Sequence, residues 1–180
     1  MQFYTFADFC QLLTKNTNRS GVDNLLVWLE ANGFPETPAS AGHHGNYRGG
    51  LLQHSICVFN RLVEEVVNTS SLHSEIPMES VAIVSLLHDV CKVDEYEILP
   101  DNTSSRRSIC LPMGHGEKSV YFIQKHMQLT DEEALAIRWH MGGWDYAAKG
   151  NDPHFSVAQN HPLTMMLHFA DMKASRFDEV

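Results

Sequence analysis

Residues 79–93 read ESVAIVSLLHDVCKV, an apolar stretch that carries His88, Asp89 and Lys92 near its end. A helix drawn over this stretch is apolar on nearly every side, which predicts a helix buried in the core. A charge in such surroundings is costly unless a partner neutralises it. Adjacent helix residues point about 100° apart, so one partner residue hardly satisfies both His88 and Asp89. A cation at the helix edge would satisfy both. The alternative is a core histidine and a buried aspartate that each bind backbone groups.

Apolar spacings of three and four residues predict further helices on both sides of this stretch. The expected helices cover residues 3–15, 22–32, 51–67, 115–127, 131–141 and 163–177, with a loop or short helix at 144–155. Glycines and prolines predict a structured loop at 33–50. In the polar segment that follows residue 93, YEIL and SICL flank DNTSSRR and predict a small β-hairpin within residues 95–112.

These elements predict an all-α fold, a compact helical bundle formed by one domain over residues 1–180. We expect the helices within residues 1–40 to pack on a metal-binding core at residues 43–177. The 43% apolar content is enough for a single core, and no apolar run is long enough to cross a bilayer. The N-terminal sequence lacks a basic region followed by an apolar stretch, and the four cysteines form no CxxC pair. A soluble cytoplasmic protein is therefore expected.

The formal net charge is −9, and the longest basic run is the pair Arg106-Arg107. An acidic surface repels polyanions, so the charge argues against a protein that holds long nucleic acid. The charge favours a small phosphorylated substrate or a short strand end over long nucleic acid, and we expect no membrane partner. The sequence does not indicate an oligomeric state.

Eleven histidines are the most unusual feature of the composition, because histidine is the commonest metal ligand among side chains. Several segments each place a histidine or an aspartate beside an apolar helix face. The candidate metal ligands are His54, His88, Asp89, His115, His140 and Asp171. A mixed set of imidazole and carboxylate suits Mn, Fe, Co, Ni or Zn better than Mg.

The order His … His-Asp … Asp, here His54, His88-Asp89 and Asp171, resembles the signature of the HD-domain superfamily of metal-dependent phosphohydrolases. The stretch HHGNYRGGLLQHS, residues 43–55, is similar to the entry into the HD domain of bacterial 3′–5′ exoribonucleases. The remaining two candidates match positions that supply a second metal in dinuclear members of the superfamily, including cyclic-dinucleotide phosphodiesterases. The resemblance extends over about residues 43–176. It departs from some dinuclear members at Met141, where they carry another histidine.

The resemblance implies one or two divalent transition-metal ions. The first would be held by His54, His88, Asp89 and Asp171, and the second by His115 and His140 with Asp89 as the bridge. Asp89, Lys92 and Arg48 are the expected catalytic residues, because a lysine and an arginine beside the metals would bind phosphate oxygens. A solvated lysine at a helix end is the alternative for Lys92. For Glu117 the alternative to a site role is a charge at a helix N-terminus. Trp144 and Asp145 are candidates to line a base or sugar pocket, and the alternative is that the tryptophan packs the loop.

The expected activity is hydrolysis of a phosphate ester of a nucleotide or short oligonucleotide, as a monoesterase or a diesterase. Two other functions fit the same ligands: a non-catalytic nucleotide-sensing or interaction module with structural metal, and a di-iron oxygenase on the same scaffold.

Overall fold

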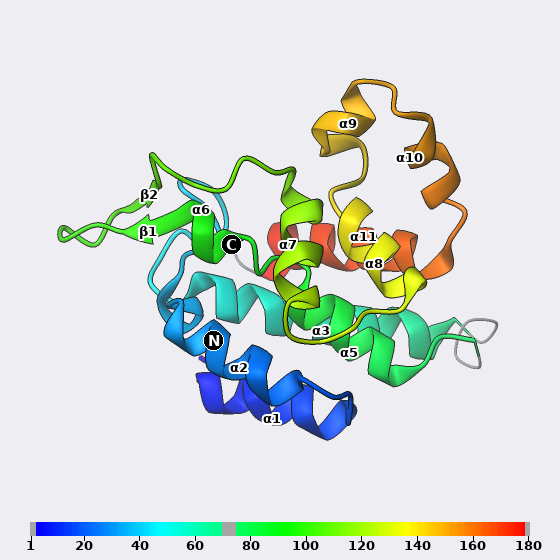
Figure 1. Ribbon diagram of the computed structural model, residues 1–180, viewed down its shortest axis with the longest axis horizontal. Helices are drawn as coiled ribbons and strands as arrows, with labels where there is room; N and C mark the ends of the chain where they lie inside the picture. Colours follow the sequence, from blue (N-terminus) through cyan, green and yellow to red (C-terminus); the bar gives the residue numbers. More distant parts are fainter. Residues whose placement is uncertain (1–2, 70–74, 179–180) are drawn as a thin grey trace.

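The computed structural model describes residues 3–69 and 75–178 (Figure 1). The fold is all-α with one small hairpin, which confirms the predicted fold class. The helices are α1 (Phe6–Asn16), α2 (Val22–Ala31), α3 (Gly50–Asn68), α5 (Met78–Leu87), α6 (Lys92–Glu95), α7 (His115–Gln124), α8 (Asp131–Trp139), α9 (Tyr146–Lys149), α10 (Pro153–Ala158) and α11 (Pro162–Lys173). Between helices lie two 3₁₀ turns, η1 (Phe34–Glu36) and η2 (Gly142–Trp144), and α11 is followed by the π turn η3 (Ala174–Asp178). The strands β1 (Tyr96–Ile98) and β2 (Ser104–Arg106) pair with each other.

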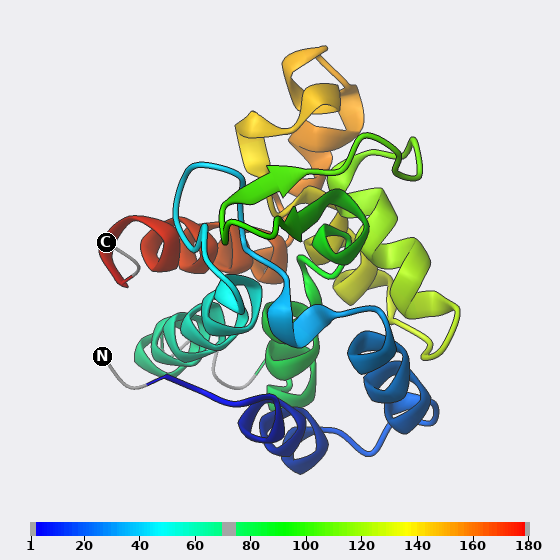
Figure 2. The ribbon, with the colours of Figure 1, turned by 90° about the vertical axis from the view of Figure 1, so that its left-hand side faces the viewer.

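Helix α5 lies at the centre of the bundle, as its apolar sequence predicts. Every residue from Ser80 to Leu87 is buried. Helices α1, α3, α8 and α11 all contact α5, and α3 and α8 both pack on α11. Figure 2 shows α1 and α2 in blue below this core and α9 and α10 in gold and orange above it. One cluster of buried apolar residues extends from Phe9 of α1 to Ala174 after α11.

The predicted helix over 79–93 is wrong at its end, because α5 stops at Leu87. The next residues form a tight turn in which Val90 N bonds Leu87 O (3.3 Å) and Lys92 N bonds Asp89 O (3.0 Å). Such i→i−3 bonds wind the backbone at three residues per turn, so residues three apart lie over one another. This turn brings the ammonium of Lys92 onto the carboxylate of Asp89. The His-Asp pair therefore lies at a break between α5 and α6.

The hairpin prediction is correct for its first strand and wrong for its second. β1 falls within YEIL, but it pairs antiparallel with Ser104–Arg106, not with SICL at 108–111. The turn explains the difference. Asn102 adopts a left-handed conformation (φ 64°), and Asp101 Oδ1 accepts from Thr103 N at 3.0 Å. This compact turn brings the residues that directly follow it opposite β1.

Other predicted helix ends differ by one to four residues. α1 begins at Phe6, not at residue 3, because Thr5 and Asp8 form a capping box that fixes its first turn. The last long helix ends as an α-helix at Lys173 and continues as the π turn η3. No helix within the described residues has the length and apolar character needed to cross a bilayer.

A buried ion pair joins the α1–α2 link to the core. Glu133, at the start of α8, is fully buried and forms a bidentate pair with Arg19, whose Nη2 lies 3.1 Å from Oε1. Ser80 Oγ of α5 donates to the same carboxylate at 2.8 Å, and Thr130 N donates to it at 2.9 Å.

We expect Arg19→Ala to lower the free energy of unfolding by about 3–5 kcal/mol, because it leaves the Glu133 carboxylate buried without its cation. Urea unfolding followed by circular dichroism measures this change. Arg107→Ala is the matched control: the Arg107–Glu97 pair spans 3.4 Å at the surface, where such pairs contribute about 0–1 kcal/mol. Equal losses in the two variants would contradict the structural role of the buried pair.

Candidate metal centre

The six candidate metal ligands, far apart in the sequence, come together at one end of α5. They are His54 of α3, His88 and Asp89 after α5, His115 at the start of α7, His140 after α8, and Asp171 of α11. Within this set, three groups of three residues each place ligand atoms within 4.8 Å of one another: His54, His88 and Asp89; His88, His140 and Asp171; Asp89, His115 and His140. The overlapping groups form one continuous cluster.

The residues implied for a first metal lie within contact distance. His54 Nε2 is 3.2 Å from His88 Nε2, 3.4 Å from Asp89 Oδ2 and 3.2 Å from Asp171 Oδ1. His88 Nε2 is 3.3 Å from Asp89 Oδ2. Burial by itself would raise the pKa of Asp171, but His54 and His88 hold it well below its usual value. The carboxylate is therefore ionised and acts as an acceptor.

Backbone carbonyls fix the orientation of two of these histidines. His88 Nδ1 donates to the carbonyl of Ser85 at 2.8 Å, and His140 Nδ1 donates to the carbonyl of Ile137 at 2.7 Å. A carbonyl only accepts, so Nδ1 must carry the hydrogen, and in the neutral ring the lone pair is on Nε2. Both rings thus turn Nε2 toward Asp89. This is the usual arrangement of a histidine that ligates a metal.

The Nε2 atom of His140 shows most clearly whether these residues fit a cation. The ring is fully buried, and burial lowers its pKa, which favours the neutral form. Within residues 3–69 and 75–178 this atom has no hydrogen-bond partner, and Asp89 Oδ1 lies 3.4 Å away. Two acceptors that face each other in a buried site need a cation or a proton between them. The residues present therefore fit a metal ion.

Asp89 is the residue common to both parts of the cluster. Its Oδ1 lies 2.6 Å from His115 Nε2, and its Oδ2 contacts His54, His88 and Lys92. The carboxylate is almost fully buried, and burial alone would raise its pKa. The charges of Lys92, His88 and His115 outweigh burial and hold the pKa of Asp89 well below its usual value. A carboxylate with contacts on both oxygens has the geometry of a bridging ligand.

His115 also contacts Cys91 and Glu95, two residues that the sequence had not indicated as part of the site. Its Nδ1 lies 3.3 Å from Cys91 Sγ and 3.5 Å from Glu95 Oε2. Burial alone would lower the pKa of His115, but Cys91 and Asp89 raise it well above its usual value. Burial alone would raise the pKa of Glu95, but the neighbouring His115 and Lys118 hold it at about 2. An anionic Glu95 therefore orients the ring from the side opposite Asp89.

A cavity of about 680 Å³ opens onto this cluster. Three of the candidate metal ligands, Asp89, His115 and Asp171, line this cavity. The rest of the wall comes from four other parts of the chain. The first two parts are the loop before α3 (Ala39, Ser40, His43, His44) and the stretch from α6 through the hairpin (Lys92, Tyr96, Arg106). The other two are the segment 141–149 (Met141, Trp144, Tyr146, Lys149) and α11 with η3 (His168, Met172, Ser175, Arg176). His43 and His44, which begin the stretch HHGNYRGGLLQHS, both line this cavity.

Of the two phosphate-binding residues predicted from the sequence, the structure brings only Lys92 to the site. Lys92 lines the cavity, is 7% exposed and pairs with Asp89, so it is not a solvated lysine at a helix end. Arg48 is absent from the cavity lining. Its exposed side chain pairs with Glu36 at the surface, because the loop before α3 turns it outward. The predicted catalytic role of Arg48 has no geometric support.

Three cations of the cavity wall were missed in the sequence: Arg106, Lys149 and Arg176. They lie on the hairpin, on α9 and on η3, which are short elements far apart in the chain. His168 was also missed; its Nδ1 donates to the carbonyl of His140 at 2.7 Å and so steadies the backbone beside a metal ligand. For Arg106 the sequence offered one signal, its place in the only pair of adjacent arginines.

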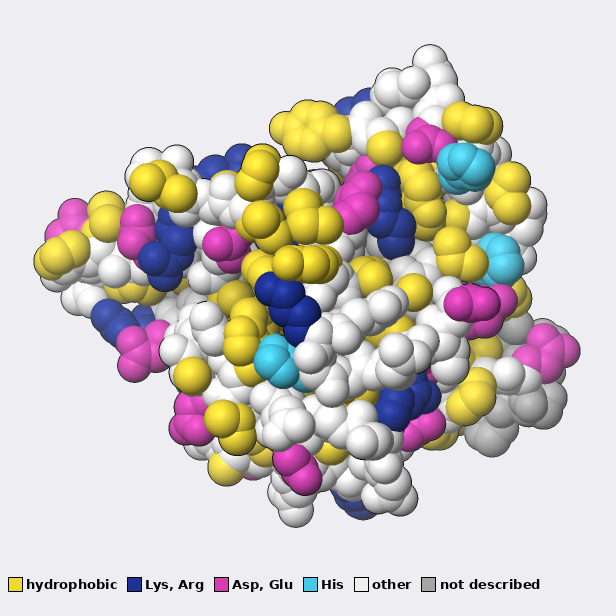
Figure 3. Space-filling view, viewed as in Figure 1, with side chains coloured by type: hydrophobic (Ala, Val, Ile, Leu, Met, Phe, Trp, Pro, Cys, Tyr) yellow, Lys and Arg dark blue, Asp and Glu magenta, His cyan; other side chains and the backbone are white. Residues whose placement is uncertain are grey.

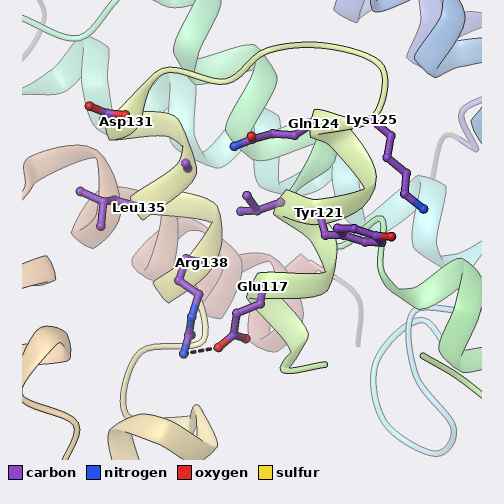
Figure 4. A pocket seen from close by; sticks show the side chains of 9 residues that line it. Glu117, Tyr121, Gln124, Lys125, Asp131, Leu135 and Arg138 are labelled. Carbon is purple, nitrogen blue, oxygen red and sulfur yellow. Dashed lines mark ion pairs between the residues drawn. The ribbon is translucent and has the colours of Figure 1, made fainter. Parts of the chain in front are cut away.

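A second depression, of about 800 Å³, lies between α7 and α8 (Figure 4). None of the six metal-ligand candidates lines it. At one end Glu117 Oε1 pairs with Arg138 Nη2 at 2.6 Å, and the other nitrogen of that arginine pairs with Asp145 Oδ2 at 3.0 Å. Glu117 and Asp145 thus link the start of α7 to the start of α9, and neither carboxylate is a metal ligand in this geometry.

Comparisons with protein-family models, with curated proteins and with solved structures give no match to this chain.

Proposed function

We propose that this chain is a metal-dependent phosphohydrolase of the HD-domain type, acting on small phosphorylated substrates. The observation that carries the proposal is the buried set of imidazole nitrogens and carboxylate oxygens around Asp89, in which His140 Nε2 lacks a partner within the described residues. His54, His88, Asp89 and Asp171 would hold one ion. His115 and His140 would hold a second, with Asp89 between them. The mixed donors favour Mn, Fe, Co, Ni or Zn.

The cavity distinguishes this proposal from a purely structural metal site. A structural site is usually closed by four protein ligands, whereas here three of the ligand residues face a cavity large enough for a small molecule. Bound at this position, a divalent ion supplies Lewis acidity, which makes water nucleophilic near neutral pH and withdraws electrons from a phosphoryl group.

Charge in the cavity supports an anionic substrate. Lys92, Arg106, Lys149 and Arg176 line the wall, against the two carboxylates Asp89 and Asp171. Lys92 Nζ is fixed by Asp89 beside the ligand cluster, where it donates hydrogen bonds to an oxygen of the reacting phosphate. The other three cations lie on separate elements, so they bind further oxygens of the substrate and orient it. A cavity with this wall favours phosphate-ester hydrolysis over the oxygenase alternative.

Substrate length is the property that the charge distribution restricts most. In Figure 3 the Lys and Arg side chains are separated by acidic and apolar ones and form no continuous basic track on the face shown. We expect hydrolysis of mononucleotides, cyclic nucleotides or dinucleotides in the presence of Mn²⁺, with a shallow dependence on salt. Contact with many phosphates of a single strand would give a slope of about −0.7 per phosphate in log affinity against log salt.

The measurement is a panel of these substrates and of long single-stranded RNA and DNA, assayed with Mn²⁺ from low to high salt. Metal content by elemental analysis is determined on the same preparation. A marked preference for long single strands would contradict the predicted substrate size. Bound iron with oxygen consumption and no hydrolysis of any substrate in the panel would support the oxygenase alternative instead.

A further inference from the structure

Two large aromatic side chains on one wall of the cavity are strongly exposed. Trp144, at the end of η2, is 58% exposed, and Tyr146, at the start of α9, is 89% exposed. Both line the cavity that opens onto the metal centre. Aromatic side chains of this size usually bury most of their surface, so an exposed pair beside a site needs an explanation.

The fold does not need these two rings to hold their segment in place. Asp145, which lies between them in the sequence, is buried and does so itself. Its Oδ1 accepts from Ala147 N at 2.8 Å and from Ala148 N at 3.4 Å, which caps α9. Its Oδ2 pairs with Arg138 of α8 at 3.0 Å. A rigid backbone thus presents both rings to the cavity, and packing of the loop by the tryptophan is not what the geometry shows.

A lysine lies beside both aromatic rings of this wall. Lys149 Nζ lies 5.6 Å from the ring centroid of Trp144 and 5.6 Å from that of Tyr146. Elsewhere on the cavity wall, Arg106 Cζ lies 5.6 Å from the ring of Tyr96. An aromatic face with an adjacent cation binds a flat, electron-rich ring that carries an anionic group. A phosphorylated nucleoside has both parts, whereas a sugar phosphate has only the anion.

We infer that Trp144 and Tyr146 form a base-binding wall, which makes phosphorylated nucleosides the substrate class of this site. The inference rests on the proposed function only for the placement of the phosphate at the metal centre. The volume of about 680 Å³ is that of a cavity for a single small ligand, which fits a mononucleotide or a similar molecule. The base stacks on the aromatic wall, and Lys149, Arg106 and Arg176 bind the charged part between the base and the metal centre.

Adenosine tests the wall independently of any hydrolysis, because it carries a base and no phosphate. The protein loaded with Mn²⁺ is titrated with adenosine and, separately, with ribose, by calorimetry and by tryptophan fluorescence. We expect adenosine to bind and to quench the emission, and ribose to do neither. The double variant Trp144→Ala, Tyr146→Ala should lower the affinity for adenosine about tenfold or more, because stacking on an aromatic side chain contributes much of the binding of a base. Trp144→Phe should keep most of the affinity and lose most of the quenching.

Tyr121→Ala is the matched control, an exposed aromatic on α7 that does not line the cavity. It should bind adenosine as the unaltered protein does. The base-binding wall is overturned if ribose binds as well as adenosine, or if the Trp144→Ala, Tyr146→Ala variant binds adenosine unchanged while circular dichroism shows it to be folded.

A second measurement separates this inference from the proposed function. The ratio of kcat/KM for adenosine 5′-monophosphate to that for ribose 5-phosphate is determined in the unaltered protein and in the double variant. A ratio that falls about tenfold supports the wall. Efficient phosphate release with a ratio near one refutes the wall and leaves the phosphohydrolase standing. Adenosine binding without hydrolysis of these esters or of the cyclic nucleotides and dinucleotides of the substrate panel refutes the phosphohydrolase and leaves the wall standing.

Discussion

Replacement of Asp89 by asparagine is expected to abolish phosphate release, with a loss of about 10⁴-fold or more, or at least 5 kcal/mol of transition-state stabilisation. The reason is the position of this carboxylate between two groups of histidines: Oδ1 faces His115 and Oδ2 faces His54 and His88. An amide at this position is a weak metal ligand and carries no charge. We therefore also expect a lower metal content per chain, measured by elemental analysis after gel filtration.

The same substitution has a folding cost that must be separated from its effect on the site. Asn at this position leaves the buried Lys92 ammonium without its partner, which we expect to cost about 3–5 kcal/mol. The variant Asp89→Asn, Lys92→Met removes that charge as well and should regain most of the stability, yet stay inactive. Asp101→Asn, in the exposed turn of the hairpin, is the matched control and should keep full activity. Normal turnover by a folded Asp89→Asn protein would refute the metal assignment.

His140→Ala is the second substitution with a large expected effect. We expect at least one ion to remain, held by His54, His88, Asp89 and Asp171, because these four contact one another without His140. Activity should fall about 100-fold or more, since even residues that only orient a metal ligand cost about 10- to 100-fold when removed. Metal content and phosphate release on the same sample give both numbers.

His161→Ala provides the control for His140→Ala, because His161 is a partly exposed histidine that pairs with Glu132 away from the cluster. It should retain both metal and activity. His140→Gln is a second variant that leaves a smaller cavity in the core. Full activity in both His140 variants would remove His140 from the mechanism and replace the dinuclear model by a mononuclear one.

The sequence predicts the helices well because their apolar residues recur at helical spacing, as in α3. A nearly continuous apolar run, as in α5, also predicts burial, because exposing it to water is unfavourable. The sequence also predicts the cluster of six metal-ligand candidates, because the order of His54, His88-Asp89 and Asp171 carries information beyond composition. The cations of the cavity wall could not be predicted. They are contributed by the hairpin, α9 and η3, and no local pattern records that short elements meet in space.

The break after Leu87 was missed for a related reason. A turn with i→i−3 bonds and an α-helix use the same backbone region, so the residues that form one are compatible with the other. Arg48 was misplaced because a glycine-rich loop leaves the direction of its side chains open. In both cases the sequence identified the segment correctly, and tertiary packing decided the orientation.

The proposed site is divided between long core helices and short surface elements, and this division affects how its ligand specificity can evolve. Most of the proposed metal ligands lie on or directly after α3, α5, α8 and α11, which pack on one another and form the core. The aromatic and cationic wall lies on η2, α9, the hairpin and the chain end, where Trp144, Tyr146 and Arg106 are exposed. Exposed positions on short elements accept substitution at little cost to the core. Substitutions in the wall would therefore change which ligand the proposed site prefers, while selection on folding preserves the proposed metal centre.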